Sequence, residues 1–313
     1  MLNRRHLRVK VMQALYAFLQ SDRKDQLAGE KELMLSIQKT WDLYLNLLLL
    51  LLEVSDFAEK QLSDAKLKLL PTAEDLNPNR RFIDNRVFRQ IRNTEEVMKL
   101  PANRRIHWPD DTIVRRLYNT LKESSRYREY MTDSESSYGA DQRLVIFMIN
   151  GVIAPSESVF QFFEEQSIFW VDDFEFACAQ VIKVIQDLTG EEEALPHQDW
   201  FVLDKEEKDF VKSLYNKTIG GNERFSSLIA DKTRNWDADR IAMMDMLLMK
   251  MALCEFVDFP TIPVKVTLNE YIDISKYYST PKSKVFVNGV LDKILAELRT
   301  AQEIKKTGRG LVE

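Results

Sequence analysis

Three arginines near the start of the chain have a spacing that could bind phosphate. Arg4 and Arg8 are four residues apart, and Arg5 and Arg8 are three apart, so on a helix the three guanidinium groups share one side of the first two turns. Cations at a helix N-terminus oppose the helix dipole, whereas a phosphate suits both the dipole and the arginines. The alternative is a solvated charged face that promotes solubility, and the residues alone slightly favour it.

A second candidate phosphate contact lies near the end of the chain. Lys282, Ser283 and Lys284 follow Ser279-Thr280-Pro281, where a hydroxyl cap and a proline predict the start of a helix. Backbone amides, a hydroxyl and two ammonium groups could converge there on one phosphate. On the residues alone this is also an ordinary helix start.

Asp245 is the acidic residue that interrupts the apolar run Met243–Met249. A buried carboxylate without a partner is costly, so we expect this side chain to reach solvent or a cation. On the residues alone it is then an ion pair at the rim of a helix.

Catalytic and metal-binding arrangements are not evident in the sequence. His6, His107 and His197 are far apart, and Cys178 and Cys254 lack the spacing of metal ligands. No glycine-rich loop follows a predicted strand, so a nucleotide site is not expected. We therefore predict a protein that is not an enzyme and has no cofactor and no metal.

The elements that must position these residues are helices. The 313-residue chain has only 9 glycines and 9 prolines, and β-branched runs alternating at period two are scarce, which predicts an all-α fold. The C-terminal third should contain three helices: Ile241–Phe256 after a cap at Asn235 or Asp237, one from Thr267 with a Glu270 capping box, and one from Pro281 to Leu298. Gly289, inside the last of these, is expected to let another backbone approach.

The first and middle parts of the chain are also predicted to be helical. Helices are expected over Asn3–Gln20, Gly29–Lys68, Asp110–Met131, Asp141–Glu165 and Ser167–Leu188, and then over Asp204–Lys217 and Glu223–Asp231. The apolar run Leu43–Leu52 is too short for a bilayer core of about 30 Å, so it should be buried.

A second group of arginines occurs in the middle of the chain. Its members are Arg80, Arg81, Arg86, Arg89, Arg92, Arg104 and Arg105, with Phe82, Phe88 and Trp108 among them. They could hold single-stranded RNA by phosphate pairing and base stacking. Alternatively, they form ion pairs while the aromatic rings pack inward, and we favour this second interpretation.

The net charge of −5 restricts any nucleic-acid contact to a local patch. No signal peptide is evident, and both cysteines lie in apolar surroundings, which predicts reduced core thiols and a cytoplasmic protein without a membrane segment. The tail around Gly308-Arg309-Gly310 is expected to be mobile.

Several sequence blocks together resemble the NusB family of bacterial transcription antitermination factors. They are Pro263-Val264-Lys265-Val266, Asn269-Glu270 and Phe286-Val287-Asn288-Gly289-Val290-Leu291-Asp292, after Trp236 and Asp239-Arg240-Ile241. Arg4-Arg5-His6-Leu7-Arg8, followed by Gln13-Ala14-Leu15-Tyr16, is similar to the arginine-rich first helix of that family. The resemblance implies a NusB-like helical bundle from residues 1–20 and 205–300, with an inserted helical region of unknown role at residues 21–204.

The resemblance also implies functional roles. RNA contacts would come from Arg4, Arg5, Arg8, Lys282, Ser283, Lys284 and Phe286, and partner contacts from Tyr16 and Asp245. The expected partners are boxA-like single-stranded RNA, the ribosomal protein that acts as NusE, and the RNA polymerase antitermination complex, chiefly in ribosomal RNA transcription. The family often has an acid near Lys282, so this lysine departs from the pattern.

Two other classes of function remain open beside this one. The chain could be a helical scaffold that has kept a NusB-like fold without RNA binding. It could also be related to ribosomal RNA methyltransferases that carry a NusB-like domain, but no cofactor-binding domain follows Leu298. Whether the protein forms a homodimer, as some family members do, also stays open.

Overall fold

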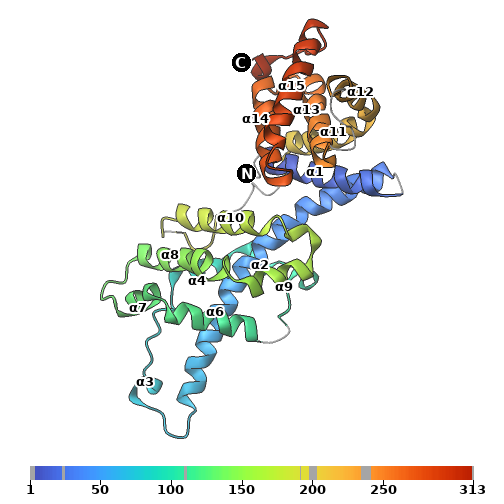
Figure 1. The fold of residues 1–313 in the computed structure, drawn as a ribbon. Helices are drawn as coiled ribbons and strands as arrows, with labels where there is room; N and C mark the ends of the chain where they lie inside the picture. Colours follow the sequence, from blue (N-terminus) through green and yellow to red (C-terminus); the bar gives the residue numbers. More distant parts are fainter. Residues whose placement is uncertain are drawn as a thin grey trace. The chain divides into compact units, whose positions relative to one another are not determined.

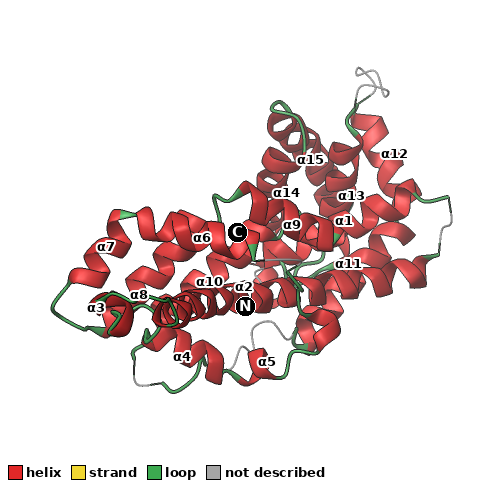
Figure 2. Cartoon of the chain, turned by 90° about the horizontal axis from the view of Figure 1, so that it is seen from below, coloured by secondary structure: helices red, strands yellow, loops and turns green. Residues whose placement is uncertain are grey.

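The computed structural model describes residues 4–22, 25–108, 111–190, 192–196, 203–233 and 241–311. These residues form helices and loops, with no strand among them (Figure 2). The all-α prediction is thus confirmed. The chain divides into two compact units: unit 1, which consists of Met1–Ile37 and Asp199–Glu313, and unit 2, which is Gln38–Gln198.

Unit 1 is a bundle arranged around one central helix. Its elements are α1 (Arg4–Gln20), the first part of α2 (Gln26–Lys66), α11 (Lys205–Gly220), α12 (Asn222–Lys232), α13 (Met243–Asp258), α14 (Val264–Tyr278), α15 (Ser283–Thr300) and the 3-10 helix η6 (Gly308–Leu311) (Figure 1). Helix α13 contacts α1, α11, α12, α14 and α15. Ten of its residues are buried, because apolar side chains surround most of its circumference.

The ends of α11 and α12 follow local sequence signals. The Asp204 carboxylate accepts a hydrogen bond from the Glu207 amide at 2.7 Å, and Glu207 accepts one from the Asp204 amide at 3.1 Å. This capping box starts α11, and Gly221 separates α11 from α12. Both helices were predicted, with a break between them at Gly220-Gly221, but the capping box was not. The predicted caps of α13, Asn235 and Asp237, lie outside the described residues.

Two helix starts differ from the prediction. Helix α14 begins at Val264, directly after Pro263, and not at Thr267. The Thr267 hydroxyl does not cap it, because it donates to Glu255 Oε2 at 3.1 Å. Helix α15 begins at Ser283, and the Ser283 hydroxyl accepts from the Thr280 amide at 3.1 Å.

Gly289 does not mark a close helix contact. A Cβ atom added at this position would meet nothing within 4 Å, and the residue is exposed. The expectation that another backbone approaches here is therefore wrong, because this side of α15 faces open space in unit 1.

The segment after α15 is fixed on the corner between α13 and α14, so the predicted mobile tail is also wrong. The Thr307 amide donates to the Pro260 carbonyl at 3.0 Å, and Lys306 Nζ donates to the carbonyls of Glu255 and Phe259 at 3.0 and 2.9 Å. Gly310 lies so close to Pro260 that a Cβ would come within 1.9 Å of its carbonyl oxygen. The carbonyls left unpaired at the end of α13 thus recruit this segment.

Unit 2 is a second helical unit. It contains the rest of α2, α3 (Ala73–Leu76), α4 (Arg86–Asn93), α5 (Glu95–Met98), η1 (Ala102–Arg104), α6 (Thr112–Glu123), α7 (Ser125–Thr132), α8 (Tyr138–Phe147), the π-helix η2 (Met148–Ile153), α9 (Glu157–Gln166), η3 (Ile168–Trp170) and α10 (Phe174–Asp187). The four helices predicted for this region correspond to α2, α6 with α7, α8 with α9, and α10. Helix α4 was not predicted.

The apolar run of α2 forms part of the unit 2 core, as expected. Its leucines are buried except Leu49, which is partly exposed. Asn46 within this run receives a hydrogen bond from the Ile106 amide at 2.7 Å and donates to the Arg104 carbonyl at 2.9 Å. Among the described residues no single helix meets the length and hydropathy of a membrane span, and one pair, Tyr138–Ile153 with Glu157–Gln166, meets them together but is bent by 80°.

Carboxylates pair with five of the seven arginines of the middle group, which confirms the ion-pair interpretation for these five. The pairs are Arg80 with Glu59 and Asp84, Arg81 with Asp133, Arg86 with Asp141, Arg92 with Asp56, and Arg104 with Asp42. Phe82 and Phe88 are buried, and Trp108 stacks on Phe162 with ring centroids 4.5 Å apart. The aromatic rings therefore serve the core.

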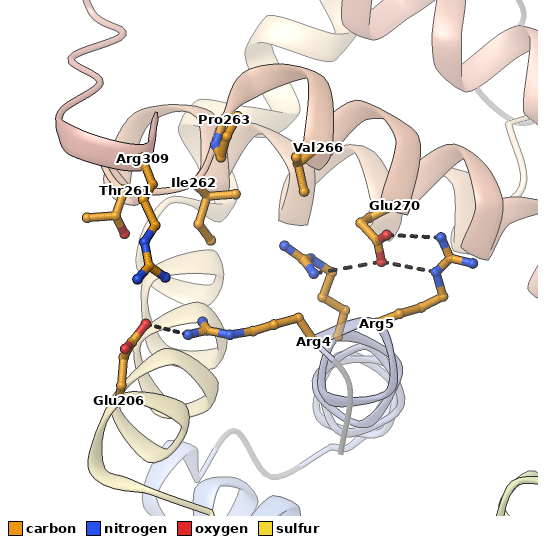
Figure 3. A pocket seen from close by; sticks show the side chains of 10 residues that line it. Arg4, Arg5, Glu206, Thr261, Ile262, Pro263, Val266, Glu270 and Arg309 are labelled. Atoms are coloured by element: carbon orange, nitrogen blue, oxygen red, sulfur yellow. Dashed lines mark hydrogen bonds and ion pairs between the residues drawn. The ribbon is translucent and has the colours of Figure 1, made fainter. Parts of the chain in front are cut away.

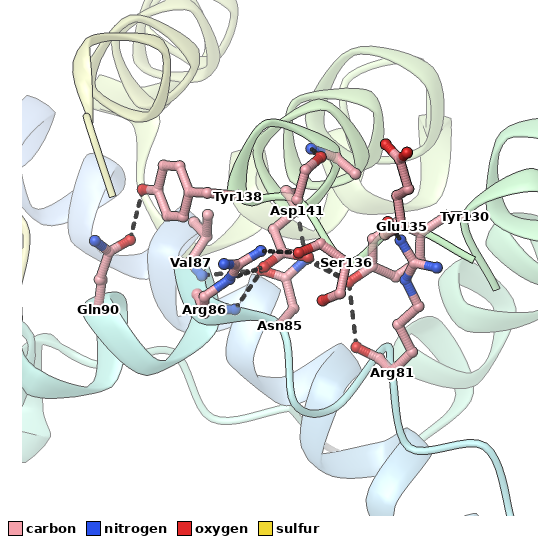
Figure 4. A network of polar contacts seen from close by, with 12 residues as sticks. Arg81, Asn85, Arg86, Val87, Gln90, Tyr130, Glu135, Ser136, Tyr138 and Asp141 are labelled. Atoms are coloured by element: carbon pink, nitrogen blue, oxygen red, sulfur yellow. Dashed lines mark hydrogen bonds and ion pairs between the residues drawn. The ribbon is translucent and has the colours of Figure 1, made fainter. Parts of the chain in front are cut away.

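Asp141 is the centre of a polar network that joins α4, α7 and α8 (Figure 4). Its carboxylate accepts from the Tyr130 hydroxyl at 2.7 Å and from Arg86 Nε at 2.6 Å. Asn85 Nδ2 donates to the Asp141 backbone carbonyl at 3.2 Å. Every carboxylate oxygen of this buried residue thus has a donor, as burial requires.

Both cysteines are free and buried, as predicted. Burial raises the pKa of Cys178 and of Cys254 to about 12. Thiols with such pKa values stay protonated at neutral pH and are poor nucleophiles.

Candidate nucleic-acid interface

Unit 1 has a pocket of about 720 Å³ at the N-terminal end of α1 (Figure 3). It is lined by Arg4, Arg5, Arg8, Glu206, Thr261, Ile262, Pro263, Val266, Glu270 and Arg309. Three arginines come from α1 and the fourth from η6, while Glu206 belongs to α11 and Glu270 to α14. The pocket therefore gathers cations from both ends of the chain.

Arg4 forms an exposed ion pair at one side of the pocket. Its Nη2 is 2.6 Å from Glu206 Oε1, and the two side chains are 38% and 76% exposed. The guanidinium also lies 4.5 Å from the centre of the Phe210 ring. Exposed pairs of this kind contribute only about 0–1 kcal/mol, so Arg4 can exchange its partner.

Arg5 is held by two carboxylates of α14. Its Nε and Nη2 donate to Glu270 at 3.0 and 2.9 Å, and Nη2 also donates to Asp273 at 2.9 Å. The hydrogen bond with Glu270, together with the charges of both acids, raises the pKa of Arg5. The side chain is still 44% exposed, so it faces the pocket with its charge largely balanced.

Arg8 is buried, which corrects the prediction of one exposed cationic side. Its Nε and Nη2 donate to the two oxygens of Glu255 at 2.7 and 2.9 Å, and Glu255 also accepts from the Tyr271 hydroxyl at 2.7 Å. Burial alone would lower the pKa of Arg8, but the charge of Glu255 and its hydrogen bonds outweigh this and raise it. Arg8 is inside because Glu255, in the apolar α13, needs a cation.

The residues predicted at the start of α15 have different surroundings. Lys282 and Lys284 are exposed, and Phe286 is partly buried. Neither lysine has an ion pair in the described parts of the chain. Ser283 is buried, and its hydroxyl donates to Asp245 Oδ2 at 2.7 Å, so this hydroxyl is not directed to a ligand.

Asp245 is buried, and no cation among the described residues pairs with it, in contrast to the prediction. Besides the bond from Ser283, its Oδ1 has no hydrogen-bond partner within the described residues. The carboxylate therefore holds the turn between α14 and α15 onto the first turn of α13. A small hydroxyl could take the place of a cation because it, too, donates a hydrogen bond to the carboxylate.

Tyr16 lies at the other end of α1 from the pocket, and it is 39% exposed. Gln20 Nε2 is 3.5 Å from the Tyr16 hydroxyl and 3.1 Å from Met243 Sδ. Tyr16 is thereby linked to the first turn of α13, where Asp245 and Ser283 meet. The predicted residues thus form two groups, one at the pocket and one around the start of α13.

Glu255 and Arg309 were given no role in the sequence interpretation, although both belong to this region. Glu255 could have been found, because an ionised residue between Cys254 and Phe256 in an apolar helix demands a buried partner. Arg309 could not, because nothing local shows that Gly310 packs on Pro260. In the ranges that the structure describes, no group of three His, Cys, Asp or Glu side chains is arranged to bind a metal ion.

Comparisons with known proteins agree on one family. The model of the NusB family matches residues 177–296, from within α10 to within α15. The transcription antitermination protein NusB of Salinibacter ruber is 41% identical over 109 residues, which are 35% of this chain and 68% of that protein. NusB of Chloroherpeton thalassium is 39% identical over 112 residues, 36% of this chain and 53% of that protein.

A third relative is more distant, the NusB of Natranaerobius thermophilus, with 27% identity over 93 residues, 30% of this chain and 67% of that protein. The matches thus span roughly half to two thirds of each relative. No solved structure matches the chain. The family-model match does not include α1, so the similarity of α1 to the first helix of the family stays a prediction.

Proposed function

Because the chain belongs to the NusB family, we propose that it acts as a transcription antitermination factor that binds single-stranded RNA. The NusB family is one of non-enzymatic transcription antitermination factors. The proposal includes boxA-like RNA, a NusE-type ribosomal protein and the RNA polymerase antitermination complex as partners, chiefly during ribosomal RNA transcription in the cytoplasm.

The pocket beside α1 is the observation that carries the RNA-binding proposal. Arg4 and Arg5 are exposed there beside α14, whose first amides have no side-chain cap. A phosphate of single-stranded RNA can replace Glu206 at Arg4 at little cost, because both charges of this pair face water. Arg8 then acts as a positioning residue that fixes α1, since its pair with Glu255 is buried.

The start of α15 provides a second group of contacts in the proposal. Lys282 and Lys284 would bind further phosphates, and the partly exposed ring of Phe286 would stack on a base. Ser283 contributes indirectly, because its hydrogen bond to Asp245 orders the turn on which both lysines stand.

For the protein partner, Tyr16 is the proposed contact. Its exposed ring offers an apolar surface with a hydroxyl that can form hydrogen bonds, as interface tyrosines commonly do. Asp245, which is buried, would support this surface and not touch the partner.

Binding of a labelled boxA-like RNA at several salt concentrations, with and without the NusE-type protein, tests the proposal. The double variant Arg4→Ala and Arg5→Ala should weaken binding. It should also reduce the slope of log K against log salt by about 1.4, that is about 0.7 for each of two lost phosphate contacts. A matched control is Arg224→Ala with Arg299→Ala, which removes two arginines of unit 1 that do not line the pocket. Equal losses in both variants would contradict a site at the pocket.

One observation favours a second candidate, a helical scaffold that does not bind RNA. All three arginines of α1 already have carboxylate partners, so the pocket is close to electrically balanced. In that case neither the wild type nor the variants would bind RNA at any salt concentration, with or without the partner.

A further inference from the structure

Unit 2 carries a group of almost fully exposed leucines at the end of α2. Leu67, Leu69 and Leu70 are at least 83% exposed, and we call these three residues the apolar tip. They lie in the connection from α2 to α3 (Figure 1). Leaving several large apolar side chains in water is unfavourable, and such patches on a folded protein usually mark an interaction site.

Polar contacts hold the apolar tip in place. Lys68 Nζ, between two of the leucines, is 2.9 Å from Asp75 Oδ1. Thr72 and Asp75 form a complete capping box at the start of α3, and the Leu67 amide donates to the Asp64 carbonyl at 3.1 Å. The leucines are thus presented to solvent by an ordered turn, which reduces the entropy lost when a partner binds.

A pocket of about 470 Å³ lies next to the tip, and we call it the tip pocket. Leu62 and Ala65 of α2 form one wall, and the aromatic residues Phe82, Tyr118 and Tyr127 form part of the other. The high exposure of the apolar tip shows that its own leucines do not fill this pocket. The edge of the tip pocket near α3 is polar and includes Glu74, Asp75 and Asn77. One unit therefore holds both an apolar protrusion and a recess with apolar walls and a polar edge.

We propose that the apolar tip of one copy binds the tip pocket of a second copy of this chain. The recess ends at Ala65 and the protrusion begins at Leu67, so the two features adjoin at the end of α2. A two-fold axis near this end would place each tip in the pocket of the other copy. Such a reciprocal contact is the usual form of a symmetric dimer interface.

The charges around the two features favour the same partner. Lys66 adjoins the protrusion, and Glu74 lines the recess. Both side chains are exposed, and neither has an ion pair within the described residues. In the two-fold arrangement, Lys66 of one copy meets Glu74 of the other, which favours this pairing over others.

The contact is small, so the dimer should be weak. A stable interface buries about 800 Å² on each partner, whereas the tip offers three leucines and their surroundings. We therefore expect a dimer that dissociates on dilution. This proposal does not depend on RNA binding, because both features belong to unit 2.

Sedimentation of the full-length protein over a range of concentrations is the first test. The wild type should shift from monomer to dimer, and Leu69→Glu with Leu70→Glu should raise the dimer dissociation constant at least about tenfold. These leucines are exposed, so the substitutions should leave the fold intact. The matched control is Ile168→Glu, also in unit 2 and 81% exposed, which should not change the dissociation constant. A wild type that stays monomeric, or a control that dissociates equally, would overturn the proposal.

A charge exchange tests the orientation of the two copies. Lys66→Glu and Glu74→Lys should each weaken the dimer, and combining them should restore it, because in a reciprocal contact the pair is only reversed. In a second measurement, Leu69→Cys and Leu62→Cys proteins are mixed and oxidised. This mixture should form a disulfide between copies faster than a mixture of the Leu69→Cys and Ile168→Cys proteins. Failure of both restoration and selective cross-linking would exclude the tip and the tip pocket as partners.

Discussion

The two units of this protein each bury one carboxylate that accepts hydrogen bonds from a tyrosine and an arginine. In unit 1, Glu255 is bound by Tyr271 and Arg8, and in unit 2, Asp141 is bound by Tyr130 and Arg86. The arginines differ in depth: the Arg8 side chain is 2% exposed and the Arg86 side chain 34%. Loss of the carboxylate should therefore cost more stability in unit 1, where the arginine is buried, than in unit 2, where the arginine reaches water.

This difference separates Arg8 from the two other arginines of α1. A buried guanidinium has no water to replace its carboxylate, so Arg8 and Glu255 must stay together. An arginine that is one-third exposed can turn to solvent when its partner is lost. Arg4 and Arg5 are still more exposed than Arg86, which supports these two as the proposed phosphate contacts.

The largest effect is expected for Glu255→Ala. It should lower the free energy of unfolding by about 3–5 kcal/mol, because the buried Arg8 would lose its two hydrogen-bonded carboxylate oxygens and keep only Glu270, 3.8 Å from its Nη1. Urea denaturation measures the loss, and amide exchange should locate it in α1, α13 and α14. Replacing both partners, Arg8→Met with Glu255→Leu, should recover much of the stability. A loss below about 1 kcal/mol would mean that the pair behaves like a surface pair.

Asp141→Ala should have a smaller effect, about 1–3 kcal/mol. It removes the nearer acceptor of the Tyr130 hydroxyl, which keeps the Arg81 carbonyl at 3.2 Å, and Arg86 can be hydrated in its absence. Increased amide exchange is expected in α4 and α8 of unit 2. Asp141→Asn, which keeps the shape and one acceptor oxygen, should lose less. If Asp141→Ala destabilised the protein as much as Glu255→Ala, the burial of the paired arginine would not determine the loss in the free energy of unfolding.

Glu206→Gln should change the free energy of unfolding by less than about 1 kcal/mol, because its pair with Arg4 is exposed. The proposed RNA site should respond in the other direction, with tighter binding, since Arg4 loses its competing carboxylate. Glu303→Gln is the matched control, because Glu303 forms an exposed pair with Arg224 in the same unit. Equal gains in RNA affinity for both variants would attribute the effect to net charge and not to Arg4.

The sequence was sufficient for the long helices and for the family, because periodic apolar residues and the blocks around Pro263 and Phe286 are local signals, but it missed the short helix α4. It was not sufficient for the partners of charged side chains. Arg4 and Arg5 are four and three residues from Arg8 on one side of α1, yet only Arg8 is buried, because Glu255, 247 residues later, lies opposite. Thr267 was also misassigned as a helix cap. Its hydroxyl binds Glu255, which lies on another helix and could not be identified as its partner from the local sequence.

The sequence also did not show which glycines make close contacts. Gly289 and Gly310 are both small residues for which a close contact is a reasonable expectation, but only Gly310 has one, with the Pro260 carbonyl. The distinction depends on what lies across the bundle, and no local pattern carries it. The same holds for Arg309, which reaches the pocket only because Gly310 fixes the tail.

The smallest predicted effect is a pH dependence of the free energy of unfolding caused by Lys306. This lysine lies near Glu255 in unit 1, and no lysine binds the Asp141 network of unit 2 within the described residues. Burial lowers the pKa of Lys306 from the ordinary 10.5 to about 8, although the charge of Glu255 opposes this. Between about pH 8 and 10.5 the unfolded chain therefore binds the proton more tightly than the folded protein, so this group makes the protein more stable as the pH rises through that window. Below about pH 8 both states are protonated, and this gain is absent.

We expect the free energy of unfolding of the wild type, measured against Lys306→Met, to increase from pH 8 to pH 10. Because the side chain is partly exposed, the increase should be well below that of a fully buried lysine. Lys305→Met is the control. Lys305 is the exposed neighbour of Lys306, so its replacement should leave the pH profile parallel to that of the wild type. A difference that falls with pH would mean that the charged ammonium, through its bonds to the Glu255 and Phe259 carbonyls, stabilises the folded state.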